Sequence, residues 1–231
     1  MKKIILISGL AIVFCLQGTA QTYKIDTAVI AFENEKRPCF RVKYDATPKA
    51  VKKAWDDYFK KTYDVKVKGI GFLSNKEVIT ATDITLVPVS DKRMNMYASV
   101  VDAPGDRSEL SFFMSFGYDF FIGPDKYPAE FSGMKKVLND FSVEFLTDFY
   151  YSEASRMTSE IKDLEKDIRK NKKDINKNTK KAREESKEVA SGLSAKNTSM
   201  EMENDQARKK IEELAKAIDN IKVKQAGVTR N

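Results

Sequence analysis

Apolar residues alternate with polar ones along much of the first half of the chain, and they recur every three or four residues along the second half. Alternation indicates half-buried strands, whereas three-four spacing indicates amphipathic helices. The alternating runs predict six strands, at residues 23–32, 39–44, 65–73, 77–87, 94–101 and 109–116. Residues 33–36 join the first two strands as a hairpin, and turn-like segments join the last four as a meander.

Two helices are predicted among these strands. Thr47 followed by Pro48 is typical of an N-cap and a first helical position, and apolar residues then recur at helical spacing as far as Phe59. A second helix begins near Gly133. The order ββ-α-ββββ-α predicts an α+β fold, an antiparallel sheet of about six strands packed by helices, and leaves the exact sheet topology open.

The last eighty residues follow a heptad pattern. Seam positions step by three and four from Ile161 to Val189, and they are apolar or small except at Asn171, Asn178 and Glu185. A second series runs from Met200 to Ile221. Gly192 is a typical helix end, and the spacing of Thr198 and Glu201 is that of a capping box. We therefore expect an antiparallel helical hairpin, with one helix to about residue 190, a turn over 191–199 and a second helix over 200–225.

Folding these helices against each other about residues 194–195 pairs equivalent seam positions. The predicted pairs are Val189 with Met200, Ala182 with Ala207, Ile175 with Leu214, and Ile168 with Ile221. This register leaves Asn171 and Asn178 facing isoleucines, which offer no hydrogen bond. Because asparagine in a coiled-coil seam often fixes the oligomeric state, a parallel homo-oligomer through the same seam stays open as the alternative.

Composition changes at Tyr151. Residues 21–151 carry equal numbers of basic and acidic side chains, while residues 152–231 carry a net charge of +5 and no aromatic or proline. The chain therefore divides into an α+β domain over 21–151 and the helical hairpin over 152–231.

The first twenty residues have the features of a secretory signal peptide. A basic start precedes an apolar run over 4–16, and small residues stand before Gln21. This segment resembles the leaders of exported bacterial proteins, which implies cleavage before Gln21 and a periplasmic or secreted location; an uncleaved membrane anchor is the alternative. No later run is long and apolar enough to span a bilayer.

Residue content excludes several kinds of chemistry. The chain has no histidine, so imidazole bases and histidine–metal sites are excluded. Cys39 alone survives leader cleavage, which rules out an intramolecular disulfide. The sequence contains no phosphate-binding glycine loop or nucleophile motif, and we expect no cofactor and no metal.

The strongest chemical signal is a basic run over residues 169–183. Its charge is +7, and its cations are Arg169, Lys170, Lys172, Lys173, Lys177, Lys180, Lys181 and Arg183. In the predicted hairpin it faces residues 206–220, which add about one further positive charge. The run predicts contact with an anionic glycan, a lipid head group or an acidic protein surface. Nucleic acid is disfavoured, because no aromatic residue is interleaved to stack on bases.

Two weaker signals lie in the α+β domain. Aromatic residues in a glycine- and proline-containing segment over 117–131 are candidates for a pocket that binds an apolar or sugar-like ligand: Tyr118, Phe120, Phe121 and Tyr127. Cys39 is a redox candidate, because Arg37 and Arg41 flank it and strand alternation puts it on a half-exposed face. A buried structural cysteine is the alternative.

These signals favour a non-enzymatic binding protein of the cell envelope, whose basic hairpin contacts an anionic surface or partner. A carrier of a small apolar ligand would instead need a cavity of several hundred Å³ under the sheet. An enzyme without a recognisable motif is the third hypothesis.

Overall fold

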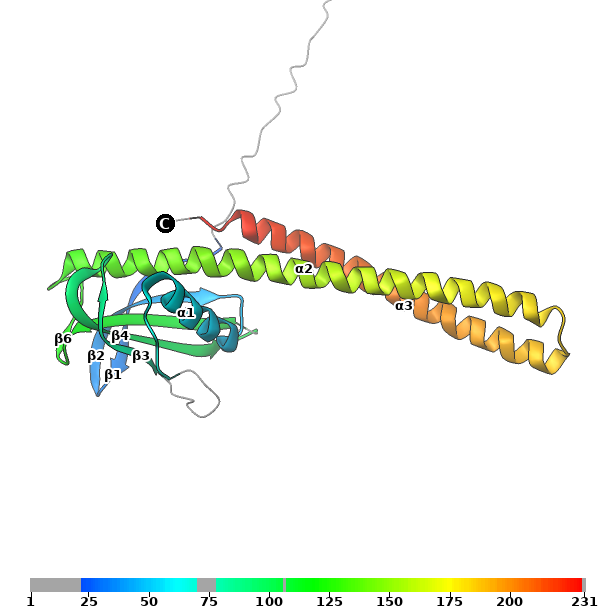
Figure 1. Ribbon diagram of the computed structural model, residues 1–231, viewed down its shortest axis with the longest axis horizontal. Helices are drawn as coiled ribbons and strands as arrows, with labels where there is room; N and C mark the ends of the chain where they lie inside the picture. Colours follow the sequence, from blue (N-terminus) through cyan, green and yellow to red (C-terminus); the bar gives the residue numbers. More distant parts are fainter. Residues whose placement is uncertain (1–21, 70–77, 106, 230–231) are drawn as a thin grey trace, which may run out of the picture.

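The computed structural model describes residues 22–69, 78–105 and 107–229 (Figure 1). The predicted leader and residues 70–73 of the predicted third strand lie outside this range. The elements in chain order are β1 (Asp26–Phe32), β2 (Glu35–Tyr44), α1 (Pro48–Tyr63), β3 (Val78–Leu86), β4 (Ser90–Ala103), β5 (Arg107–Phe116), β6 (Phe120–Phe121), α2 (Pro128–Ala182) and α3 (Lys187–Ala226).

The strands form one antiparallel sheet, which confirms the α+β prediction. Its order is β1-β2-β5-β4-β3, with the short β6 paired to β5. The meander from β3 to β5 is as expected, whereas β6, which extends it, was not predicted. Strand β2 pairs with β5, and the chain crosses over from β2 to β3 through α1. The predicted strand over 65–73 is wrong in its described part, where Lys68 makes a single bridge to Thr80. The sixth strand is β6, in a segment predicted to be a loop.

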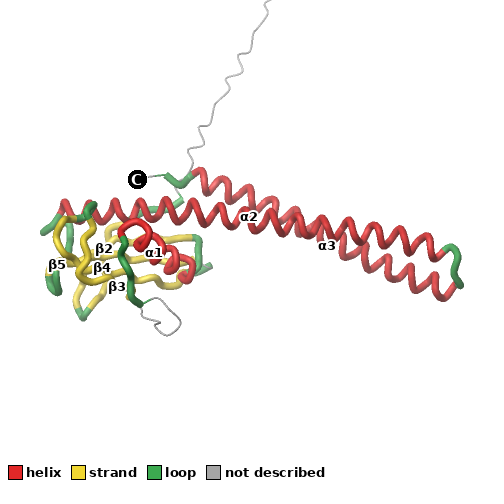
Figure 2. The backbone as a smooth tube through the Cα atoms, viewed as in Figure 1, coloured by secondary structure: helices red, strands yellow, loops and turns green. Residues whose placement is uncertain are grey.

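The main hydrophobic core lies between the sheet and the helices α1 and α2 (Figure 2). Thr47 caps α1 by accepting a hydrogen bond from the Ala50 amide, as predicted. The Trp55 ring is fully buried and lies 5.3 Å from Phe112 of β5 and 4.8 Å from Phe141 of α2, centroid to centroid. Large aromatic side chains of this kind contribute most of the apolar area buried in such a core.

Helix α2 belongs to both parts of the molecule. Its first part, as far as Tyr150, packs on the sheet, and the helix then continues without a break into the hairpin. With 55 residues it is about 80 Å long, at 1.5 Å per residue. Gly133 allows a close approach near its start, because a Cβ atom there would lie 2.3 Å from the carbonyl oxygen of Pro88. The change in composition at Tyr151 thus marks the point where α2 stops packing on the sheet. It does not mark the end of the helix.

The tail is an antiparallel hairpin, as predicted, but its turn lies earlier in the chain. Helix α2 ends at Ala182 and α3 begins at Lys187, whereas the turn was predicted over 191–199. Gly192 and the Thr198–Glu201 pair lie inside α3. Helix α3 therefore has 40 residues, and neither local signal ends or starts a helix here.

Polar side chains in the seam show the register of the two helices. The side-chain amide of Asn178 donates a hydrogen bond to the side-chain oxygen of Asn197 over 2.9 Å. The side-chain amide of Asn171 donates to the Glu203 carboxylate over 3.3 Å. Asn197 also donates to the Ile175 carbonyl oxygen over 3.5 Å. Facing positions are therefore shifted by two heptads from the predicted pairing. The shift is a whole number of repeats, so the seam faces are as predicted while the partners are wrong.

The far end of α3 returns to the α+β part beside the first described residues. The Thr22 amide donates to the Gly227 carbonyl oxygen over 3.2 Å. The Tyr23 hydroxyl lies within hydrogen-bonding distance of Asn139 of α2, at 2.7 Å, and of the Thr229 carbonyl oxygen, at 2.9 Å. Lys224 forms an ion pair with Asp45 at 2.6 Å. Both helices of the hairpin are thus fixed at its base.

Candidate functional site

The basic run occupies the last four turns of α2 and its C-cap residue, Arg183, at the end of the hairpin farthest from the sheet (Figure 1). All eight of its cationic side chains are exposed. Arg169 lies 3.9 Å from Glu165, and Lys181 lies 3.9 Å from Glu185. Within the described residues the other six cations form no ion pair. Their charge is therefore largely uncompensated by neighbouring side chains.

The segment of α3 that faces the basic run differs from the predicted one. In the observed register the run faces residues 192–206 rather than 206–220. These residues carry Glu201, Glu203 and Asp205 against a single Lys196, a net charge of −2. The prediction that the partner segment adds positive charge is therefore wrong. The acidic residues lower the total charge of this half of the hairpin but leave a clear positive excess.

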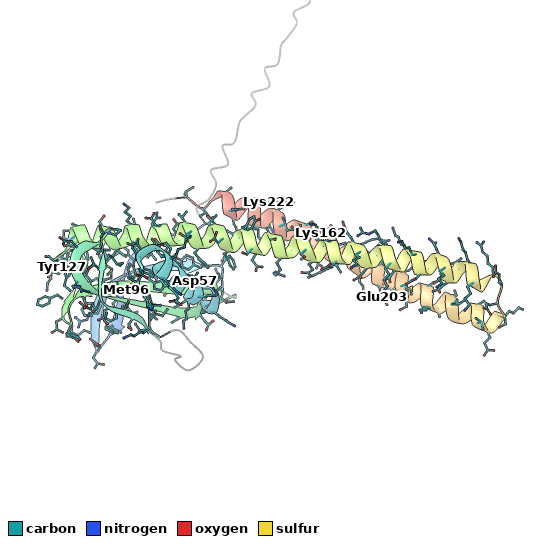
Figure 3. The ribbon with its side chains drawn as sticks, in the orientation of Figure 1. Asp57, Met96, Tyr127, Lys162, Glu203 and Lys222 are labelled. Atoms are coloured by element: carbon teal, nitrogen blue, oxygen red, sulfur yellow. The ribbon has the colours of Figure 1, made fainter. Side chains whose placement is uncertain are left out.

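The aromatic candidates are only partly brought together. Phe120, Phe121 and Tyr127 line one cleft of about 200 Å³. Tyr118 is 84% exposed and projects from the β5–β6 turn instead. The cleft lies at the end of the molecule opposite to the hairpin tip, as Tyr127 shows (Figure 3).

Charged side chains also line this aromatic cleft. The Arg37 guanidinium lies 4.1 Å from the Phe121 ring centroid and is paired with Glu35 at 2.6 Å. Lys36, Asp119 and Lys126 line it too. Its volume falls below the range of about 300–1,000 Å³ that is usual for small-molecule pockets. The geometry therefore gives this candidate pocket less support than the basic run.

Cys39 is fully buried, and strand alternation was misleading about its exposure. Its side chain does lie on the sheet face away from the helices, but a second cluster with Tyr97, Phe113 and Phe121 covers it. Phe32 of β1 completes this cover, with its ring centroid 5.1 Å from that of Phe113. Burial raises the pKa of the Cys39 thiol to about 11, and nearby Arg41 opposes this only in part. The environment thus disfavours the reactive thiolate.

A groove between α1 and α2 was not found by sequence reasoning. It measures about 390 Å³ and has an aromatic floor that includes Tyr58, Phe141 and Phe145. Its rim is charged, with Lys61 paired to Glu144 at 2.9 Å. The only signal for it in the sequence is the alanine pair of α1, Ala50 and Ala54, whose small side chains leave the space open.

Comparison with known proteins gives no further guide. No family model, curated protein or solved structure matches this chain significantly.

Two kinds of site are missing from the part of the chain that the structure describes. It contains no cluster of three or more acidic or cysteine side chains arranged to hold a metal ion. None of its helices is both long and apolar enough to cross a membrane. The basic run is the candidate site that geometry and charge support best.

Proposed function

We propose that this protein is a non-enzymatic binding protein of the cell envelope, in which the hairpin contacts an anionic surface. One observation carries the proposal: at the tip of a long hairpin, the basic run presents six exposed cations that form no ion pair with any residue the structure describes. Cations of this kind release bound counterions from a polyanion, and each contributes to an affinity that depends on salt.

The packing of the α+β part supports a binding role over that of a carrier. Buried aromatic and aliphatic side chains occupy the space between the sheet and the helices, where a carrier would need its cavity. The groove between α1 and α2 and the aromatic cleft both open at the surface. The sheet and its helices are therefore proposed to act as a stable base for the hairpin.

The proposed location rests on the first twenty residues. Export places the protein among the anionic lipids and glycans of an envelope. Expression in a bacterial host followed by N-terminal sequencing tests this, with Gln21 expected as the first residue. An intact Met1 in the cytoplasmic fraction would contradict export.

A charge-reversal experiment tests the binding function. We expect the mature protein to bind heparin and vesicles containing phosphatidylglycerol, and both affinities to fall steeply as salt rises. Changing Lys172, Lys173, Lys180 and Lys181 to Glu leaves the apolar and asparagine residues of the seam unaltered and should abolish binding. A matched control makes the same change in four exposed lysines of the α+β part: Lys36, Lys49, Lys60 and Lys126. Absence of binding by the unaltered protein at low salt would refute the proposal.

A further inference from the structure

The seam between the two helices defines which face of α2 points outward. Ile168, Ile175 and Asn178 face α3, so the heptad positions b, c and f lie on the opposite side. These three rows fall within about 50° of the outward direction, because successive heptad positions are about 100° apart. Side chains in all three rows point away from the seam together.

The outward face of α2 is basic over a greater length than the basic run. From Arg156 to Arg183 it has twelve positions, of which nine are basic and one, Asp163, is acidic. The nine cations are Arg156, Lys162, Lys166, Arg169, Lys170, Lys173, Lys177, Lys180 and Arg183. This outward face is about 40 Å long. Figure 3 shows where Lys162 lies along it.

The acidic residues of this part of α2 are sorted to the flanks of the seam. Glu153, Glu160, Glu165, Asp167 and Asp174 all occupy the e and g positions next to α3. Arg156 forms ion pairs with Glu153 at 2.9 Å and Glu160 at 3.5 Å. Apart from Arg156 and Arg169, the cations of the outward face form no ion pair within the described residues. Nine of the eleven cations between Arg156 and Arg183 thus lie on the outward face, and the other two, Lys172 and Lys181, lie on the flanks with the acidic residues.

Helix α3 shows no such sorting. Its outward positions carry five acidic residues and two lysines: Glu188, Asp205, Glu212, Glu213, Asp219, Lys209 and Lys216. Lys216 is moreover paired with Glu212 at 2.7 Å. The hairpin is therefore basic on one side only. The same net charge could have been spread over both helices, so its concentration on α2 is a separate feature of the hairpin.

We infer that the outward face of α2 lies flat on the anionic head groups of a lipid bilayer. This inference rests on the proposed function and names the surface it contacts. A plane reaches the b, c and f rows at once, whereas a single polymer strand follows one row. Between Arg156 and Arg183 the face has no apolar side chain to insert into hydrocarbon, so the contact stays at the head-group level. Long lysine side chains even out the different heights of the rows.

Vesicle binding by the mature protein tests this inference. One variant changes the outward Lys170, Lys173, Lys177 and Lys180 of α2 to Gln. A matched variant changes Lys196, Lys209, Lys210 and Lys216 of α3 to Gln, which removes the same charge from the other helix. A third variant replaces the four α2 lysines with Arg. Circular dichroism checks that the helix content of all three is unchanged.

The expected result depends on which helix loses its charge. Affinity for phosphatidylglycerol vesicles should fall about a thousandfold in the α2 Gln variant, by less than about threefold in the α3 variant, and not at all in the Arg variant. Equal losses in the two Gln variants would show that net charge alone matters and would overturn the inference. Binding of heparin but not of vesicles would also overturn it while leaving the proposed function intact. Binding of neither would refute both.

Discussion

Two glycines in helices illustrate how the surroundings of one residue decide the effect of one methyl group. Gly192 lies inside α3, and a Cβ atom there would meet nothing within 4 Å. Gly133 lies inside α2, where the same atom would lie 2.3 Å from the Pro88 carbonyl oxygen.

We expect Gly192→Ala and Gly133→Ala to have opposite effects. Gly192→Ala should raise the free energy of unfolding by about 0.5–1 kcal/mol, because alanine loses less backbone entropy in a helix. Gly133→Ala should lower it by about 1–3 kcal/mol, since α2 must move away from the chain at Pro88. Urea denaturation curves, monitored by circular dichroism, measure both changes in unfolding free energy. A stabilising Gly133→Ala would contradict the close approach of α2 to Pro88.

Burial should make Cys39 unreactive in the folded protein. With its pKa raised from 9.0 to about 11, the folded state holds about a hundredfold less thiolate near pH 8 than an unfolded chain. Labelling by a thiol reagent should therefore be at least about a hundredfold slower without urea than in urea. Rapid labelling of the folded protein would show that Phe32 and its neighbours do not cover the thiol.

The same shift predicts how stability depends on pH. The folded state favours the protonated thiol, so this contribution is complete below about pH 9 and is lost as pH rises to about 11. Cys39→Ala removes the titrating group. The difference in unfolding free energy between the two proteins should therefore shrink over that interval.

At the scale of elements, the asparagine layer fixes the register of the hairpin. Asn178→Leu should destabilise the hairpin by about 1–3 kcal/mol, because it leaves the Asn197 side chain short of a partner. Changing both to Leu should restore much of that stability but weaken the specification of register. Double-mutant denaturation curves measure the coupling between the two side chains.

Cysteine pairs report the register directly. In a Cys39→Ala background, Ile175→Cys with Met200→Cys should form an intrachain disulfide, since these positions lie one layer from the asparagine pair. Ile175→Cys with Leu214→Cys should not, because in this register the two are about 20 Å apart. Cross-linking of the second pair alone would contradict the observed register, and interchain bonds would indicate the parallel oligomer.

Local sequence signals were sufficient for most of the elements. Thr47 and Pro48 located the start of α1, and alternation located β1, β2, β4 and β5 to within a few residues. These features depend on neighbouring residues alone. Exposure was harder to predict, as Cys39 shows, because its cover comes from Phe32 on another strand.

The register of the hairpin could have been chosen from charge and polarity. A shift of two heptads keeps every apolar position in the seam, so apolar spacing alone cannot distinguish the two pairings. In the observed pairing Asn178 meets Asn197, and the basic run faces Glu201, Glu203 and Asp205. The predicted pairing favoured the local signals at Gly192 and Thr198, which long-range pairing overrides.

At the scale of the whole molecule, the hairpin should tolerate changes of length only in matched steps. Duplicating residues 161–167 of α2 together with the facing residues 208–214 of α3 adds one heptad to each helix. The hairpin should lengthen by about 10 Å, and the contacts of Tyr23 with Thr229 and Asn139 should survive. Small-angle scattering measures the longer maximum dimension.

Duplicating residues 161–167 alone provides the control. The seam then shifts by one heptad, so α3 ends about 10 Å from its place beside Thr22 and the junction opens. The free energy of unfolding of this single-duplication variant should be lower than that of the matched variant. Equal stability of the two would mean that the junction contributes little.

The continuity of α2 gives the molecule a mechanical property. The stretch as far as Tyr150 is held by the sheet and by α1, while the remainder extends about 48 Å beyond it. A tilt of about 10° at the held end therefore moves the tip by about 8 Å. The groove between α1 and α2 lies at the pivot of this lever. A small shift of the side chains that line this groove would tilt α2, and the charged tip of the hairpin would then move several times farther than the groove residues themselves.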